Sequence, residues 1–324
     1  MATLYLQIYF GGMIFNMLYN FGAAILRAVG ETKKPLYFLG IAGLANVGLN
    51  FLLVLVFHLD VAGVAIGTIV SQAISCIMIV LSLMRRKGIV HLDLKKLKVD
   101  RKCLGEMILI GLPAGIQGSL FSVSNVFIQS AVNSFKTSVV VAGNTAAANL
   151  EGFVYAGMNS FYQACITFTS QNYGAGKIKN CKKALLYSQL CTIVSGVLFG
   201  GLVLLFGRPL LGIYTPNPEA IDIGMIRLEI ICTTYFLCGI MDVMVGGLRG
   251  LGYSIVPMIV SILGACVFRL IWIYTIFQVE HTLFILYISY PISWLVTGLV
   301  HLICYLVVYR KVKRKLMYLN LITD

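Results

Sequence analysis

Residues 26–35 read LRAVGETKKP, and residues 248–257 read LRGLGYSIVP. Both follow the pattern L-R-x-x-G-x-x-x-x-P, and the two arginines are 222 residues apart, at positions 27 and 249. Arginine suits the negative end of a helix dipole, glycine can adopt the left-handed conformation that caps a helix, and proline is tolerated where the next helix begins. The pattern therefore predicts, twice, a helix end followed at once by a helix start. Its expected structural residues are Arg27, Gly30, Pro35, Arg249, Gly252 and Pro257.

The composition around these two segments is that of a membrane protein. Of the 324 residues, 59% are apolar and only 11% are charged, whereas a soluble domain has about 25% charged residues. This excludes a soluble enzyme, a secreted disulfide scaffold and a disordered chain. Because lipid offers no partner for backbone N–H and C=O groups, we predict an all-α integral membrane protein. Nine apolar stretches are long enough to span a bilayer, at about 4–26, 36–57, 61–84, 105–132, 139–170, 184–206, 225–248, 256–278 and 283–309.

The charge distribution predicts an orientation. The net charge of +13 comes from 25 Lys and Arg against 12 Asp and Glu. We attribute this excess to cytoplasmic loops, and we predict no nucleic-acid partner. With the C-terminus inside, 21 basic residues fall inside, Arg269 lies within a helix, and three fall outside, namely Lys136, Arg208 and Arg227.

The two copies of the pattern predict a repeat with parallel halves. Both copies fall on the inside, so an axis along the membrane normal relates them. The second copy ends the fourth of six predicted helices, whereas the first copy ends the first of three. We therefore expect a partial three-helix lobe at 1–84, a cytoplasmic linker at 85–102, a complete six-helix lobe at 103–309 and a basic cytoplasmic tail at 310–324. On this interpretation three helices are missing from an N-terminally truncated, twelve-helix protein.

Ionisable residues inside membrane spans are candidates for a functional site. Asp242 and Glu151 are the deep acids of the six-helix lobe, and we predict that they bind a cation. The alternative for Asp242 is an ion pair with Arg269 or Arg249. Amide and hydroxyl residues at helical spacing predict a cavity lining, with interhelical hydrogen bonds as the alternative. These residues are Ser122, Asn125, Gln129, Asn149, Asn159 and Gln163.

Three segments of the chain resemble the multidrug and toxic compound extrusion (MATE) transporters. They are GLP at 111–113, TFTSQNYGAG at 167–176, with Gln171, Asn172 and Gly174 as its motif residues, and GLRGLG at 247–252. The resemblance implies two helical bundles around a central cavity in the bacterial cytoplasmic membrane, in contact with membrane lipids. It implies a secondary antiporter that exports small organic cations and drugs, driven by inward Na⁺ or H⁺ and without another cofactor or metal. One acid that the family often carries after Pro113 is absent, and Phe121 and Ser122 stand there.

Two other classes of protein remain as alternatives, and the sequence argues against a third. A lipid-linked oligosaccharide flippase of the same superfamily would need several Lys or Arg in its cavity, to bind pyrophosphate. A non-transporting fragment is the second alternative. A membrane-embedded enzyme would need a catalytic set, such as paired His or Asp at helical spacing, and the sequence contains none, so we predict that the protein is not an enzyme. The sequence also has no G-x-x-x-x-G-K-[ST] motif, so any transport is predicted not to use a nucleotide bound by this chain.

Overall fold

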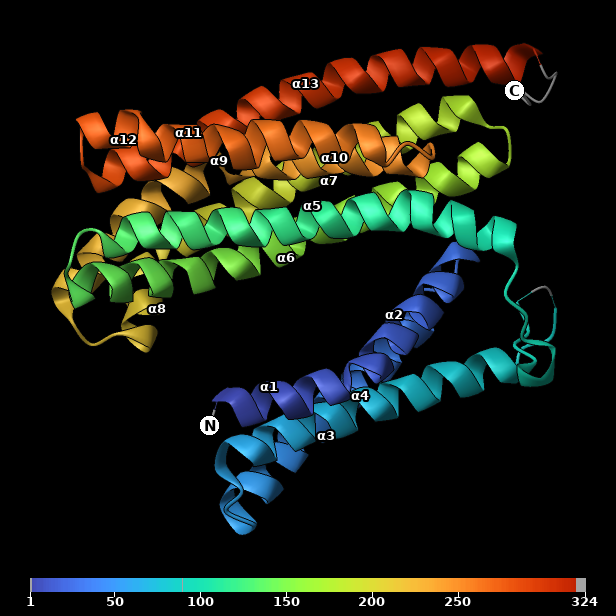
Figure 1. Ribbon diagram of the computed structural model, residues 1–324, viewed down its shortest axis with the longest axis horizontal. Helices are drawn as coiled ribbons and strands as arrows, with labels where there is room; N and C mark the ends of the chain where they lie inside the picture. Colours follow the sequence, from blue (N-terminus) through green and yellow to red (C-terminus); the bar gives the residue numbers. More distant parts are fainter. Residues whose placement is uncertain (1, 89, 319–324) are drawn as a thin grey trace. The chain divides into compact units, whose positions relative to one another are not determined.

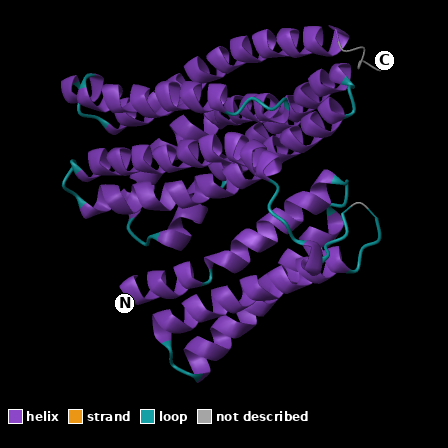
Figure 2. Cartoon of the chain, turned by 45° about the vertical axis from the view of Figure 1, so that its right-hand side comes forward, coloured by secondary structure: helices purple, strands orange, loops and turns teal. Residues whose placement is uncertain are grey.

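The computed structural model of the protein describes residues 2–88 and 90–318 (Figure 1). Helices make up 88% of the structure, short loops connect them, and the described residues contain no strand (Figure 2). The all-α prediction is therefore confirmed. The chain divides into two compact units, Met1–Val99 and Asp100–Asp324.

The first unit is a small helical bundle built around α4. Helix α4 packs against the three helices that precede it, and Asn46 on α3 donates a hydrogen bond to Ser71 on α4 at 3.4 Å. Amides at helical spacing thus connect helices in this unit. Its elements are α1 (Ala2–Gly11), α2 (Met13–Ala28), α3 (Lys33–Phe51), the π-helical turn η1 (Leu52–Val56), α4 (Asp60–Met84) and the short 3₁₀ helix η2 (Leu94–Lys96).

An acidic side chain joins the ends of three helices in the first unit. Glu31 lies between α2 and α3, and its carboxylate is 2.6 Å from the Lys34 ammonium and also binds the Arg86 guanidinium after α4. The hydrogen bond from Lys34 and the charges of Lys34 and Arg86 hold the pKa of Glu31 below its usual value.

This lowered pKa predicts a pH dependence of stability. A carboxyl whose pKa is lower in the folded state stabilises the protein above its unfolded-state pKa, and this contribution is lost as the pH falls through the folded-state pKa. The thermal midpoint in detergent should therefore fall on acidification through the ordinary carboxyl range, and this fall should be smaller in Glu31→Gln. An identical acid response in the variant would assign the effect to other groups.

The described residues of the second unit form six long helical segments, some of which are interrupted by turns or π-helical residues. Its elements are α5 (Arg101–Asn133), α6 (Ser138–Gly174), α7 (Ile178–Leu205), α8 (Gly207–Tyr214), α9 (Pro218–Gly250), α10 (Ile255–Ser261), the π-helical turn η3 (Ile262–Val267), α11 (Phe268–Tyr274), α12 (Ile276–Val279) and α13 (Leu283–Tyr318). Helix α13 continues into the predicted tail as far as Tyr318, and residues 319–324 of that tail lie outside the described part of the chain.

Helix α9 forms the centre of the second unit. In its most apolar window 56% of the residues are buried, against 28% in α7, and it packs mainly on α6, α13 and α7. Small residues allow this close approach. A Cβ atom on Gly143 would lie 2.3 Å from the Ala220 carbonyl oxygen, and one on Gly200 would lie 2.7 Å from that of Cys232. The surroundings of the site in this unit are therefore tightly packed.

The number of spanning helices agrees approximately with the prediction of nine. Within the described residues, seven helices are long and apolar enough to cross a membrane, and the pair α1–α2, bent by 44°, would make an eighth span. Helix α6 is the remaining predicted span. It is 37 residues long, but polar side chains such as Asn144 and Glu151 lower its hydropathy. Helix α6, whose polar side chains lower its hydropathy, thus carries Glu151, one of the two acids that the sequence predicts for the functional site.

The two copies of the L-R-x-x-G-x-x-x-x-P pattern have the same local structure. The glycine of each copy has a positive φ, +83° at Gly30 and +87° at Gly252. The residue after the glycine donates its N–H to the carbonyl of the pattern's leucine, at 2.9 Å in the first copy and 3.0 Å in the second. This 6→1 bond with a left-handed glycine is the Schellman cap. The Q-N-x-G-A-G segment ends α6 in the same way, with Gly176 rather than Gly174 in the left-handed conformation, at φ +72°.

Replacing Gly252 with alanine is expected to destabilise the second unit by about 1–2 kcal/mol, because a Cβ is disfavoured at positive φ. Gly105→Ala is the matched control, since Gly105 lies in helix α5 and nothing is within 4 Å of an added Cβ. That change should leave stability unchanged or raise it slightly, as alanine favours a helix. The unfolding midpoints of the two variants in detergent test this difference. Equal midpoints would contradict a stabilising role of Gly252 as a left-handed helix cap.

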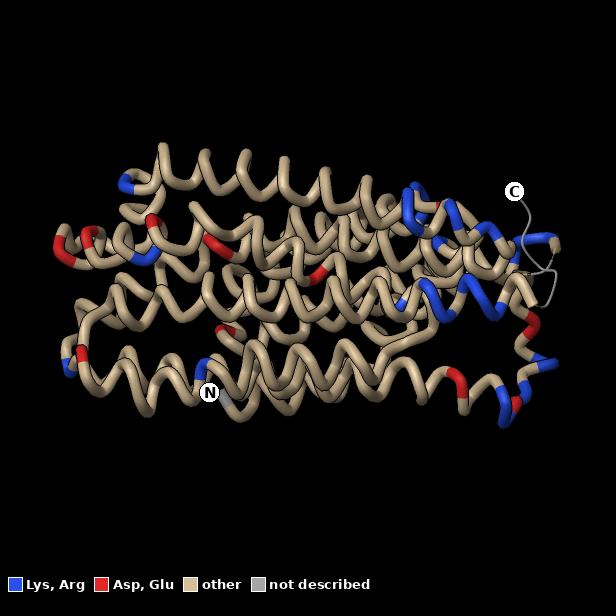
Figure 3. The backbone as a smooth tube through the Cα atoms, turned by 90° about the horizontal axis from the view of Figure 1, so that it is seen from above, with Lys and Arg blue, Asp and Glu red and all other residues tan. Residues whose placement is uncertain are grey.

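Basic residues gather at one end of the second unit (Figure 3). The start of α5, the connection between α6 and α7, the end of α9 and the end of α13 all lie at this end (Figure 1). This arrangement is typical of the cytoplasmic side of a membrane protein. That this end faces the cytoplasm stays a prediction.

Candidate functional site

The second unit contains a cavity of about 550 Å³ between α5, α6, α9, α11 and α13. This volume is in the range of sites for drug-sized ligands. The charged residues of the wall comprise two acids and two arginines, Glu151, Asp242, Arg227 and Arg269. Its aromatic residues are Phe121, Tyr155, Tyr235, Tyr290 and Trp294. The wall is thus aromatic with a few polar groups, and its formal charges balance.

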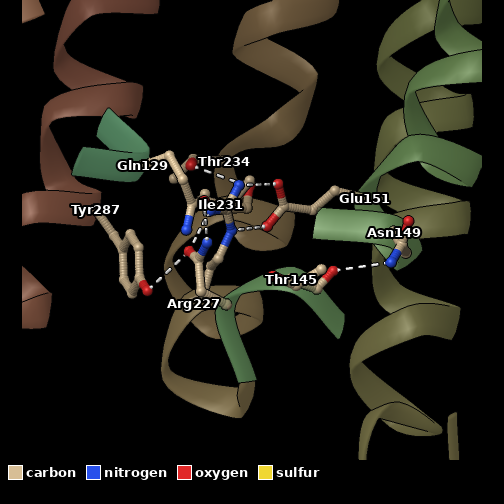
Figure 4. A network of polar contacts seen from close by, with 9 residues as sticks. Gln129, Thr145, Asn149, Glu151, Arg227, Ile231, Thr234 and Tyr287 are labelled. Carbon is tan, nitrogen blue, oxygen red and sulfur yellow. Dashed lines mark hydrogen bonds and ion pairs between the residues drawn. The ribbon is translucent and has the colours of Figure 1, made fainter. Parts of the chain in front are cut away.

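Glu151 on α6 and Arg227 on α9 form a buried ion pair on this wall (Figure 4). Arg227 Nε and Nη2 each donate to one carboxylate oxygen of Glu151, both at 2.7 Å. The side chains are only 7% and 8% exposed. This two-bond geometry is the strong form of an arginine–carboxylate interaction. Both oxygens of Glu151 are therefore already hydrogen-bonded within the protein.

The ion pair belongs to a hydrogen-bonded network that connects four helices. Arg227 Nη1 donates to Asn144 Oδ1 at 2.5 Å, and the Tyr287 hydroxyl on α13 donates to the same oxygen at 3.1 Å. Asn144 Nδ2 in turn donates to Gln129 Oε1 on α5 at 3.0 Å. A buried polar network with its partners in place fixes the positions of its members. This part of the wall is consequently rigid.

Asp242 on α9 has a different environment from Glu151. Its carboxylate is half-buried at the cavity and accepts a hydrogen bond from the Tyr155 hydroxyl at 3.2 Å. The sequence left open an ion pair between Asp242 and Arg269 or Arg249. In the described part of the chain, neither arginine forms an ion pair with Asp242. Arg249 instead donates to Gln117 Oε1 at 2.9 Å. A carboxylate at the cavity without a basic partner can bind a cation.

Arg269 on α11 carries a buried charge into the same cavity. The residue is 3% exposed, and its Nε donates to Ser293 Oγ at 2.9 Å. Its guanidinium carbon is 4.2 Å from the centre of the Tyr290 ring and 5.7 Å from that of Trp294. Its Nη2 is buried without a hydrogen-bond partner among the described residues.

The structure brings together part of the polar lining that the sequence predicts. Asn125, Gln129, Glu151 and Asp242 line the cavity. The lining residues, all in described segments, do not include Ser122, Asn159, Gln163 or Asn149. Asn149 faces a second hollow beside Thr145, to whose carbonyl it donates at 3.0 Å (Figure 4).

The placement of Arg227 on the outside is wrong, because Arg227, like Arg269, lies within a helix. Helix α9 begins at Pro218 rather than near residue 225, so Arg227 lies well inside the helix and is 6% exposed. Asn217 caps this start by accepting a hydrogen bond from the Glu219 N–H at 2.9 Å. An asparagine before a proline at the first helical position is a start signal that identifies this earlier beginning.

Comparison with known proteins places the chain in a family. The sequence model of the MatE family matches residues 113–275, about half of the chain and most of the cavity wall. A protein from Bacillus subtilis (strain 168), "Probable multidrug resistance protein YpnP", is 28% identical over 269 residues, which are 83% of this chain and 60% of the relative. "Probable multidrug resistance protein NorM" from Thermotoga maritima is 24% identical over 80% of this chain and 56% of the relative. The chain thus spans about 60% of the length of these curated relatives.

Solved structures show the same fold. A transporter described under "Reverse polarity of binding pocket suggests different function of a MOP superfamily transporter from Pyrococcus furiosus" superposes with a TM-score of 0.89 at 19% identity, over 96% of this chain and 70% of that one. "Crystal structure of MATE in complex with MaL6" gives 0.89 at 18% identity, over 97% and 71%. The family match over half of the sequence and the shared fold agree, and this integral membrane protein belongs to the MatE family.

Proposed function

We propose that the chain functions in a secondary antiporter that exports small organic cations and drugs, driven by inward Na⁺ or H⁺ flow. The observation that carries this proposal is the half-buried Asp242 carboxylate, which lies on an aromatic cavity wall without a basic partner in the described structure. Carboxylate and aromatic faces are the groups that attract an organic cation. The names of the curated relatives, which describe multidrug resistance proteins, support the same substrate class.

The two acids have different roles in this proposal. Asp242 is the group whose occupancy changes, because a proton or Na⁺ and the drug cation compete for it. Glu151, predicted from the sequence as a second cation ligand, has both oxygens engaged by Arg227, so we assign it to positioning Arg227 and the wall around it. No cofactor other than the coupling ion is proposed. The protein is proposed to lie in the bacterial cytoplasmic membrane, in contact with lipid, with its C-terminus inside.

The flippase alternative has less support from the cavity. A pyrophosphate carries several negative charges, whereas here one of the two cavity arginines, Arg227, is already neutralised by Glu151. Only Arg269 remains to receive an anion, and Asp242 on the same wall would repel one. The cavity therefore lacks the several free basic groups that a pyrophosphate would need.

Transport by the purified chain in proteoliposomes tests the proposal. Vesicles are loaded with a fluorescent organic cation, and a Na⁺ gradient, a pH gradient or neither is then imposed. We expect the dye to move against its own gradient with one of the two ion gradients and not without one. If neither gradient drives dye movement, the chain does not transport by itself and the non-transporting alternative holds.

A further inference from the structure

Arg269 has hydrogen-bonding capacity that the protein does not use. A guanidinium has five N–H donors in a planar fork. In the described structure Nε of Arg269 donates to Ser293, while the buried Nη2 has no acceptor. A buried charge without a counter-ion is costly, and proteins retain one mainly where it has a function. Arg269 is one of the residues that line the cavity, so its guanidinium lies beside the space that a ligand would occupy.

The two acids of the cavity do not neutralise Arg269. Glu151 uses both of its oxygens on Arg227, and Asp242 accepts from Tyr155. Among the residues that the structure describes, neither acid forms an ion pair with Arg269. The guanidinium is instead held by ring contacts from α13, with Tyr290 at 4.2 Å and Trp294 at 5.7 Å. These rings fix its orientation and leave its charge available.

The backbone before Arg269 is specialised for this position. The π-helical turn η3 (Ile262–Val267) directly precedes α11, and such turns frequently occur at functional sites. Within η3, a Cβ added to Gly264 would lie 2.3 Å from Thr297 Oγ1 on α13. This close approach packs η3 against α13, directly before the α11 segment that carries Arg269. A larger residue at position 264 would displace the segment that presents Arg269.

We propose that Arg269 receives the carboxylate of an aromatic zwitterion whose positive group lies at Asp242. This proposal rests on the proposed function and narrows its substrate class. The planar fork of a guanidinium matches one carboxylate, and a single free arginine suits a singly charged group. The unsatisfied charges of the wall are one positive and one negative, so a ligand that carries both is matched without leaving either charge buried alone.

Binding of two dyes that differ in one group tests the proposal directly. Rhodamine 110 carries a free carboxylate near neutral pH, and rhodamine 123 is its methyl ester with the same cationic ring system. We expect the purified full chain to bind rhodamine 110 between about tenfold and a hundredfold more tightly, because only the free carboxylate can form charge-assisted hydrogen bonds with the guanidinium. In Arg269→Gln this preference should disappear through weaker binding of rhodamine 110, while rhodamine 123 binds as before or more tightly.

Control variants separate this site from a structural role of Arg269. Arg208→Gln removes an exposed arginine that pairs with Asp222 outside the cavity, and it should keep the wild-type preference. Arg269→Lys keeps the charge without the fork and should keep part of the preference. Unfolding midpoints show whether each variant is folded, and the wild-type comparison does not depend on any variant.

Equal binding of the two dyes by the wild-type chain would overturn the proposal, as would a full preference in folded Arg269→Gln. A different result would contradict the proposed export of organic cations. If rhodamine 123 binds without any contribution from Asp242, the cation site is wrong, whatever the preference for the carboxylate. A preference for rhodamine 110 that vanishes in Arg269→Gln would still establish the anion subsite.

Discussion

Replacing Glu151 with glutamine is expected to lower the free energy of unfolding by about 3–5 kcal/mol, because the variant leaves the buried charge of Arg227 without its counter-ion. The glutamine keeps the shape of the side chain, so the loss reports the charge rather than a cavity. Unfolding in a denaturing detergent, followed by far-UV circular dichroism, measures it. The same variant should perturb Asn144 and Tyr287, which share the network with Arg227.

The matched control is the exposed ion pair of Arg208 and Asp222. Its atoms are also 2.7 Å apart, but its side chains are 68% and 58% exposed. Asp222→Asn should therefore cost below about 1 kcal/mol, since solvent screens exposed pairs. A double change of Glu151→Leu with Arg227→Met removes both charges and should recover much of the stability that Glu151→Gln loses. If Glu151→Gln costs no more than Asp222→Asn, the buried pair is not the stabilising element described here.

The second large effect is expected for Asp242→Asn. Asparagine keeps the size and the possibility of a bond with Tyr155 but removes the negative charge. The dissociation constant for rhodamine 123 should rise between about tenfold and a hundredfold, the range that corresponds to losing a charge-assisted contact of about 1.5–3 kcal/mol. Fluorescence titration of the purified protein measures this change.

Two controls show whether a weaker affinity of Asp242→Asn comes from the lost cation contact. Asp222→Asn removes an exposed acid away from the cavity and should leave the dissociation constant unchanged. Thermal midpoints establish that the Asp242 variant is folded. Unchanged affinity in a folded Asp242→Asn protein would mean that the positive group of the ligand lies elsewhere on the wall.

Much of the fold could be predicted from the sequence, because a membrane imposes strong constraints on composition and length. The apolar stretches predict the helices, since lipid leaves the backbone no other hydrogen-bonded arrangement. The twin pattern predicts helix ends at Gly30 and Gly252, where only a residue without a Cβ adopts the observed φ without strain. These signals are local, so they can be interpreted without knowledge of tertiary contacts.

The candidate site was harder to predict, because it depends on which helix faces meet. Asn125 and Gln129 share a face with Ser122, yet the first two line the cavity and Ser122 does not belong to its described lining. The partner of Glu151 could not be identified either, since Arg227 is 76 residues away in sequence and an apolar window placed the start of its helix too late. Arg269 was visible as a deep charge, but its free donors follow only from the position of α13.

We propose that the coupling ion and the organic cation compete for the same group, the carboxylate of Asp242. The most direct measurement is the dissociation constant of rhodamine 123 for the purified chain, across a series of Na⁺ concentrations at constant ionic strength and across a pH series without Na⁺. We predict that binding weakens as Na⁺ rises or as the pH falls, and that Asp242→Asn loses this dependence. A wild-type affinity independent of both ions, or the same dependence in Asp242→Asn, would contradict the claim.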